Sequence, residues 1–398
     1  MAQLSESDDP NHVVSSPYST HEATFTKRRP STISTETLTS PSLPTLPFDV
    51  LAEILCMLPV KLLLQLRCLC KSFNSIISDP KFAKKHLRLS TPHHNLIVSS
   101  TNYLNQLLLF VSPIPSVFST STVTQRLLTY PKTLTQEYGA PLDVCSCDGI
   151  LCLTLDDRHR HALLWNPSIG KYNKLPRLET THKRNSFSLY SFGYDPFIDD
   201  YKVFVVSFCD KYNYSEVNVH VMGTMSWKRV DNFPYCSSIR RSGVFVGGAV
   251  NWLAFDKMSS WRAIVSFDLK DELYQTLLQP DLENDLWTLG VAKDCLCIFA
   301  SSQICLDVWI MKEYGKESWI KLCSVPYIEN RGLYAYTKAL YISEDDRVLM
   351  DFHELRSVNL KLVVYDSKND TLKIPDIQTI NHWMDPEVYV ESLISPCS

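Results

Sequence analysis

The sequence lacks the long apolar segments and the one-sided charge that mark two large classes of protein. No apolar run is long enough to span a bilayer, and the N-terminus has no apolar signal-peptide core. The formal net charge is only −4, which gives no electrostatic reason to expect nucleic acid or an anionic membrane as a partner. We therefore expect a soluble globular protein that binds neither nucleic acid nor membrane.

Catalytic signatures are also missing. There is no G-x-S-x-G, H-E-x-x-H, papain-like cysteine, G-x-G-x-x-G or P-loop pattern. Two polar clusters do occur, and their members are Asp156, Asp157, His159 and His161, and Asp351, His353 and Glu354. The first is better explained as a solvated hairpin tip. An enzyme is therefore disfavoured, and we expect no catalytic residues and no cofactor.

The 13 cysteines form no regular framework and are scattered through apolar segments. Without a secretion signal, they indicate free thiols in the reducing cytoplasm, nucleus or both. Cys145/Cys147 and Cys295/Cys297 are C-x-C pairs in strand-like runs, where alternation puts both sulfurs on one face. Zinc sites usually space paired ligands more widely, so we expect core packing here and no metal.

The first 42 residues are rich in Ser, Thr and Pro and poor in aromatics, which predicts a disordered tail. Apolar residues at helical spacing then follow Pro47, as far as Pro59, and recur over residues 60–78. Asp79-Pro80 is typical of the cap and first residue of a further helix. The pattern predicts several short helices within about 45 residues, after which the helical spacing stops.

From about Asn95 the pattern is that of short β-strands, and a repeat emerges. Each unit has an apolar strand, a polar turn and a second strand, with anchors seven residues apart such as Trp165 and Tyr172, or Phe267 and Tyr274. Two further strands precede each unit, which is the signature of a propeller blade. Five complete blades and a degenerate first one predict six, with the run "VYVESLIS" closing the ring against the first. An open or two-sheet β-fold would use the same strands.

The helical segment "LPFDVLAEILCMLPVKLLLQLRCLCKSFNSIISDPKFAKKHL" resembles an F-box. The match is dense and nearly gapless. It departs at Phe73, where relatives usually carry Trp, and at Leu63, where Ser is common. The resemblance implies docking onto a SKP-type adaptor, and through it onto the cullin and RING subunits of a ubiquitin ligase. The adaptor-binding residues that it implies are Leu46, Pro47, Ile54, Leu55, Leu58, Pro59, Leu66 and Cys70. For Ile54 and Leu66, packing of the helices on one another is an equally good explanation.

The β-region resembles the plant F-box-associated domain, to which kelch-type annotation is often attached. The motifs that carry this resemblance include "CSCDGILCL", "LWNPSIGKYNKLP", "SFGYDPFIDDYKVFVV", "GVFVGGAVNWLA" and "YVESLISP". From the residues alone these motifs are turn chemistry and packed aromatics, and Gly247-Gly248 suits a hairpin turn. Loops such as "DKYNYSE" and "DDRHRH" are where a target would be chosen.

Together these observations predict an α+β multidomain chain: a tail over residues 1–42, an F-box over 43–90, and an all-β, six-bladed, kelch-like propeller over 91–398. The function they imply is that of a substrate receptor in an SCF (SKP–cullin–F-box) ubiquitin ligase, which presents a protein target for ubiquitination and degradation. The alternative is a non-degradative propeller that binds a protein or a glycan and uses the F-box only as a docking tag. The sequence does not identify the target.

Overall fold

The computed structural model describes residues 47–101, 107–119, 122–130, 143–155, 161–179, 186–209, 214–234, 238–239, 241–255, 262–282, 286–302, 304–327, 334–354, 360–377 and 384–397. The predicted tail, residues 1–42, lies outside these ranges. Within them, none of the helices has both the length and the apolar character needed to cross a membrane.

Four consecutive short helices form what we call the helical unit. They are α1 (Phe48–Cys56), α2 (Val60–Leu66), α3 (Lys71–Ile77) and α4 (Pro80–Leu89). Pro47 and Pro59 immediately precede α1 and α2 in an extended conformation, because proline fixes φ and gives up no hydrogen bond at a helix start. The carboxylate of Asp79 accepts a hydrogen bond from the Lys81 backbone N–H at 2.9 Å, so the predicted cap of α4 is confirmed.

Cys70 separates α2 from α3. Its backbone is extended, and its Sγ atom accepts a hydrogen bond from the Phe73 backbone N–H at 3.5 Å. Serine, threonine, asparagine and aspartate are the usual residues at such a cap, because an oxygen is a better acceptor than a thiol sulfur. The start of α3 is therefore held by a weak cap.

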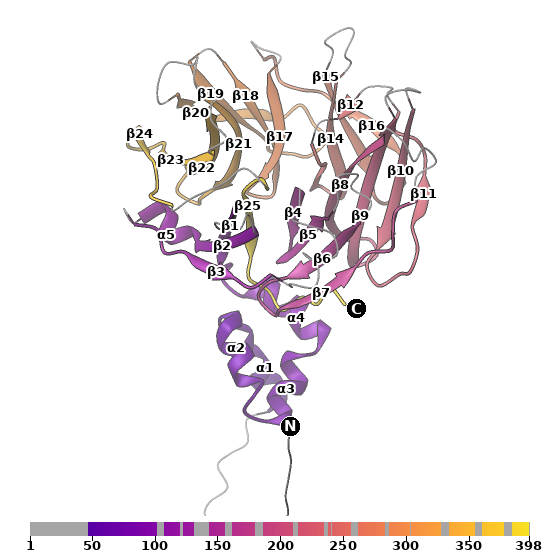
Figure 1. The fold of residues 1–398 in the computed structure, drawn as a ribbon, viewed down its shortest axis with the longest axis vertical. Coiled ribbons are helices and arrows are strands. Elements are labelled where there is room, and N and C mark those ends of the chain that lie inside the picture. The colour runs from indigo at the N-terminus through magenta and orange to yellow at the C-terminus, as the bar shows by residue number, and fades with distance from the viewer. Residues whose placement is uncertain are drawn as a thin grey trace, which may run out of the picture. The chain divides into compact units, whose positions relative to one another are not determined.

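Six antiparallel sheets follow, and each is one blade (Figure 1). Blade 1 is β25 (Glu387–Val390), β1 (His94–Thr101), β2 (Leu107–Pro113) and β3 (Arg126–Leu128), with α5 (Ile114–Ser119) after β2. Blade 2 is β4 (Asp143–Cys147), β5 (Ile150–Thr154), β6 (Ala162–Asn166) and β7 (Lys171–Lys174). Blade 3 is β8 (Ser186–Asp195), β9 (Asp200–Cys209), β10 (Tyr214–Val221) and β11 (Lys228–Val230).

The remaining three blades repeat this plan. Blade 4 is β12 (Ser238–Ile239), β13 (Val244–Val246), β14 (Ala249–Phe255), β15 (Arg262–Asp268) and β16 (Tyr274–Leu277). Blade 5 is β17 (Trp287–Ala292), β18 (Cys295–Ser301), β19 (Cys305–Met311) and β20 (Trp319–Pro326). Blade 6 is β21 (Tyr334–Ile342), β22 (Arg347–Glu354), β23 (Leu360–Asp366) and β24 (Thr371–Lys373).

The inner strands of the six blades form a closed circle. Taken in order, β25, β4, β8, β13, β17 and β21 each contact the next, and β21 contacts β25. The ring closes in blade 1, where β25 pairs with β1 and places Tyr389 opposite Asn95. Closure removes exposed sheet edges between the first and last blades. The predicted six-bladed propeller, with its last strand in the first blade, is therefore confirmed.

Apolar side chains that alternate along the strands meet between neighbouring blades. Phe204 of blade 3 and Trp252 and Phe267 of blade 4 share one buried cluster, with edge-on ring contacts. The anchors predicted from the repeat are direct partners across the strands, as Trp165 with Tyr172 and Phe267 with Tyr274 show. The seven-residue offset is thus the sequence separation of two residues that pair across one hairpin.

Gly247 and Gly248 form the two-residue turn between β13 and β14, as predicted. Both have positive φ, +64° and +75°, which glycine tolerates at no steric cost. A Cβ atom on Gly247 would lie 2.3 Å from the Tyr314 ring of blade 5. The absent side chain therefore lets a neighbouring blade pack against the turn.

Candidate docking site

The helical unit leaves several large apolar side chains in solvent. The exposed ones are Val50, Ile54, Met57, Leu62, Leu69 and Leu89. Met57 is 72% exposed and Leu69 is 70% exposed, although both belong to a unit of only about 40 residues. A concentration of apolar surface at this density indicates a site that another protein covers. We call the exposed residues Val50, Ile54, Met57, Leu62 and Leu69 together the open side.

The predicted adaptor-binding residues lie at different depths in this unit. Pro47, Ile54, Pro59 and Cys70 are exposed, and Leu58 and Leu66 are half-buried. Leu55 is only 2% exposed and packs in the core beneath them. Leu46 lies outside the described residues. Adaptor contact therefore stays a prediction for the whole set, and Leu55 can take part only by supporting the residues above it.

Exposed lysines follow or precede residues of the open side in the sequence. Lys61 and Lys71 are exposed beside Leu62 and Cys70, and no carboxylate of the described residues lies within ion-pair distance of either amine. Within the part of the chain that the structure describes, the Arg67 guanidinium has one long hydrogen bond, 3.4 Å from Nε to the Asn74 Oδ1 atom. A partner that covers this surface therefore meets apolar side chains beside unpaired positive charge.

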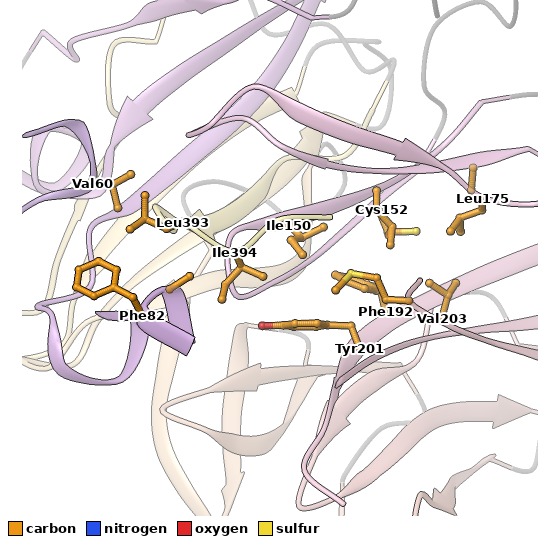
Figure 2. Close-up of a cluster of buried hydrophobic side chains, with 14 of the residues drawn as sticks. Val60, Phe82, Ile150, Cys152, Leu175, Phe192, Tyr201, Val203, Leu393 and Ile394 are labelled. Atoms are coloured by element: carbon orange, nitrogen blue, oxygen red, sulfur yellow. The ribbon is translucent and has the colours of Figure 1, made fainter. Parts of the chain in front are cut away.

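Other residues of the helical unit are covered by the propeller. Val60 and Phe82 share one buried apolar cluster with Ile150 of blade 2 and with Leu393 and Ile394, which follow β25. Figure 2 shows Leu393 and Ile394 lying between Val60 and Phe82 on one side and Ile150 on the other. We call Ile150, Leu393 and Ile394 the seat of the helical unit. Because helix and propeller share one apolar cluster, the two bury surface against each other.

Charged groups flank the seat at the turn between β8 and β9. The Lys84 Nζ atom lies 2.9 Å from the Asp199 carboxylate, and the Arg88 guanidinium is 3.8 Å away. A hydrogen bond from the Tyr194 hydroxyl, followed by that from Lys84, lowers the pKa of Asp199. Asp199 is 61% exposed, so solvent screens these interactions and they stabilise the contact only weakly.

Of the two polar clusters noted in the sequence, Asp156, Asp157 and His159 lie outside the described residues. Asp351 is buried and accepts a hydrogen bond from the Lys338 backbone N–H at 3.0 Å, where the register of β21 is irregular. Burial raises the pKa of Cys147 well above its usual range, which keeps the thiol protonated and unreactive. Across the described ranges, no three His, Cys, Asp or Glu side chains gather as a metal site requires.

The two loops predicted to choose a target lie mostly outside the described residues. Of the "DDRHRH" loop only His161 is described, and of "DKYNYSE" only residues 214–216, which begin β10. Target choice by these loops therefore stays a prediction.

Sequence reasoning missed two parts of the site. Met57 and Leu69 are the most exposed apolar residues of the helical unit, but a motif comparison selects only positions that match. The sequence feature that could have identified them is that each is an apolar residue outside the buried stripe of the helices. Leu393 and Ile394 lie within the quoted run "YVESLISP", but their contact with α4 joins residues about 300 positions apart and leaves no local pattern.

Comparisons with known proteins agree with this architecture. Residues 43–85 match the F-box domain, and residues 104–396 match the F-box associated beta propeller domain. An F-box/kelch-repeat protein of Arabidopsis thaliana is 30% identical over 88% of this chain and 96% of its own length. F-box protein CPR1 of Arabidopsis thaliana is 29% identical over 89% of each chain. The chain therefore belongs to the plant F-box proteins in which the F-box is followed by an F-box-associated β-propeller.

Proposed function

We propose that this protein is the substrate receptor of an SCF ubiquitin ligase. The F-box docks on a SKP-type adaptor, and through it on the cullin and RING subunits. The propeller binds a protein target, which is then ubiquitinated and degraded. The observation that carries the proposal is that the F-box packs on its own propeller and still leaves large apolar side chains exposed.

The proposed adaptor contacts combine the predicted residues with those that the structure adds. Pro47, Ile54, Leu58, Pro59, Leu66 and Cys70 are at least partly accessible, and Met57, Leu62 and Leu69 join them. Leu46 remains a proposed contact, and Leu55 supports the surface from below. Each large side chain covered on docking contributes about 1.5–3 kcal/mol before the costs of association.

A receptor of this kind needs no catalytic residue of its own, because the partner subunits transfer ubiquitin. The proposal therefore includes a non-catalytic role and a site of action in the cytoplasm, the nucleus or both, where the ligase and its targets meet. The propeller supplies the target-binding part, since loops on a rigid scaffold carry recognition in many folds.

The experiment is reconstitution of the complex from purified parts. The full chain, a SKP-type adaptor and a neddylated cullin–RING pair are expected to co-elute in gel filtration. The double variant Met57→Asp/Leu69→Asp is expected to stay monomeric and folded. Co-elution of that variant with the adaptor would contradict the assignment of the open side.

The same variant separates the ligase role from a non-degradative one. Expressed in plant cells, it is expected to retain bound targets that the wild-type protein destroys, so those targets accumulate. If the targets have equal lifetimes with the wild-type and variant proteins, the propeller is a binding module without a degradative role.

A further inference from the structure

The chain does not stop when the ring closes. After β25, residues 391–397 form a segment that we call the strap. The Glu391 backbone N–H donates to the His93 carbonyl oxygen at 2.9 Å, which holds the start of the strap beside blade 1. The Cys397 Sγ atom lies 3.2 Å from the Tyr172 carbonyl oxygen, which holds its end beside blade 2. The strap therefore connects the first two blades.

One side chain holds the middle of the strap. Asn166, which is fully buried, directs its Nδ2 atom at the Ser392 carbonyl oxygen (3.1 Å), the Ser392 Oγ atom (3.1 Å) and the Ile394 carbonyl oxygen (2.8 Å). Its Oδ1 atom accepts a hydrogen bond from the Ser168 backbone N–H at 2.8 Å. The donor end of a buried amide is thus directed to the strap, while its oxygen is held by the β6–β7 turn.

A second contact requires the absence of a side chain. Gly149, in the β4–β5 turn, has a φ of +83°, and a Cβ atom placed there would lie 2.4 Å from the Ser392 Oγ atom and 2.6 Å from the Val390 carbonyl oxygen. Both the positive φ and the close approach demand glycine. The Asp148-Gly149 pair of the "CSCDG" motif is therefore shaped to receive the strap.

The strap presents its apolar side chains to the F-box. Its polar contacts run to the propeller, whereas Leu393 and Ile394 are buried in the cluster that includes Val60 and Phe82 (Figure 2). The packing of a close-packed cluster changes in discrete steps, so a fixed strap fixes the helices that pack on it. The ion pairs of Asp199 with Lys84 and Arg88 are exposed and cannot hold the orientation alone.

We infer that the strap is the positioning element that sets the orientation of the F-box on the propeller, and that Asn166 is the residue that holds the strap in place. This inference rests on the proposed function for its consequence. In a ligase, the fixed orientation determines which lysines of the bound target, and of the propeller itself, come within reach of the ubiquitin-loaded enzyme.

The first experiment measures hydrogen exchange in the full chain. Asn166→Asp keeps the shape of the side chain and its acceptor for Ser168, but it replaces the donor that binds the strap. The amides of α4 are expected to exchange at least tenfold faster in this variant, while those of β14 and β15, in blade 4, are unchanged. Asn232→Asp, which makes the same change at an exposed residue after β11 and keeps the acceptor for Arg229, is the control and is expected to exchange as the wild-type protein does.

A second variant covers the case in which Asn166→Asp fails to fold. Leu393→Ala/Ile394→Ala leaves the backbone acceptors for Asn166 in place and removes only the apolar contact with the F-box. It is expected to release α4 in the same way. Unchanged exchange in α4 would overturn the inference, and so would equal loss of protection in α4 and in blade 4, because the strap would then serve only ring closure.

The second experiment uses the reconstituted ligase without a target. Wild-type protein is expected to be self-ubiquitinated at a few propeller lysines, and both variants at a broader set, with adaptor affinity unchanged. If the strap had only a structural role, both variants would be less ubiquitinated, but at the same lysines as the wild-type protein. If wild-type protein fails to bind the adaptor, the proposed function is wrong, but the hydrogen-exchange result is still valid. If adaptor binding is normal and the ubiquitinated lysines are the same in wild-type and variant proteins, only the inference about the strap is wrong.

Discussion

Lysine, arginine and large apolar residues occur on both sides of the F-box, and the two sides differ in whether these residues have partners. On the α4 side, Lys84 and Arg88 face Asp199, and Phe82 is buried in the seat cluster. On the open side, Lys61 and Lys71 lack carboxylate partners among the described residues, and Leu69 is largely in solvent. Lys84, Arg88 and Phe82 thus have partners in the propeller, whereas Lys61, Lys71 and Leu69 have none among the described residues.

This difference shows how a small helical unit is stabilised without losing its binding surface. A unit of about 40 residues buries too little surface to be stable alone, so it needs support. The propeller gives this support from one direction, through the seat. The open side therefore does not have to contribute to folding, and its side chains are available for a partner.

The largest expected effect tests the seated side. Phe82→Ala removes a buried ring, and we expect it to lower the free energy of unfolding by about 3–5 kcal/mol in denaturant titrations. Leu69→Ala, on the open side, is the matched control and is expected to change stability by less than about 0.5 kcal/mol. Equal losses of stability in the two variants would show that the seated side and the open side contribute equally to folding.

The next effect tests the open side. Met57→Asp/Leu69→Asp is expected to weaken binding to a SKP-type adaptor by about 100-fold, because two covered apolar side chains are lost. Calorimetry measures the affinity, and thermal melting is expected to be unchanged. Met225→Asp changes an 88% exposed propeller residue in the same way and is expected to leave binding intact.

A smaller effect tests the unpaired cations. Lys61→Glu/Lys71→Glu is expected to reduce adaptor affinity several-fold and to flatten its dependence on salt, because favourable charge pairs at the edge of an interface are screened by salt. The control Lys270→Glu/Lys368→Glu makes the same change of net charge on the propeller. A control that loses as much affinity would show that only the total charge matters.

A change at the cap of α3 is expected to have a smaller effect, and this one stabilises the protein. Cys70→Ser replaces a weak sulfur acceptor by an oxygen, and we expect a gain of about 0.5 kcal/mol in the free energy of unfolding. Cys68→Ser, two residues earlier and outside the cap, is the comparison. A gain of the same size at Cys68 would mean that the cap is not the cause.

The smallest effect comes from Asp199. Its pKa is below the usual 3.8 in the folded chain, because Tyr194 and Lys84 donate hydrogen bonds to the charged form. The stabilisation is therefore complete above that usual value and is lost as the pH falls through the lower folded-state pKa. Asp199→Asn is expected to melt slightly below wild-type protein at pH 7, and the difference is expected to shrink as the pH falls below 3.8. A difference that grows as the pH falls would contradict this account.

The sequence predicted the parts of the fold that depend on local patterns. Helical spacing after Pro47, the cap at Asp79 and the offset between Phe267 and Tyr274 each reflect interactions within a few residues, and the structure has all three. Repetition of the hairpin then gave six blades. The boundaries predicted for the tail, the F-box and the propeller stay predictions.

The long-range contacts that hold the strap and the F-box on the propeller could not be predicted in this way. Asn166 and Ser392 lie 226 positions apart, and Lys84 and Asp199 lie 115 positions apart. No periodicity connects such residues, so Asn166 suggested only a turn. In the F-box, motif positions identified the family but not the depth of each side chain, which is why Leu55 was included and Met57 was not.

The pairing of β25 with β1 has a consequence for synthesis. A ribosome makes the F-box before it makes the closing strand β25 and before Leu393 and Ile394 of the seat. Until residues 387–394 leave the ribosome, the F-box lacks these two seat residues and the first blade keeps an unpaired edge at β1. A message cut short before Glu387 therefore yields a chain that carries a docking helix but no finished receptor.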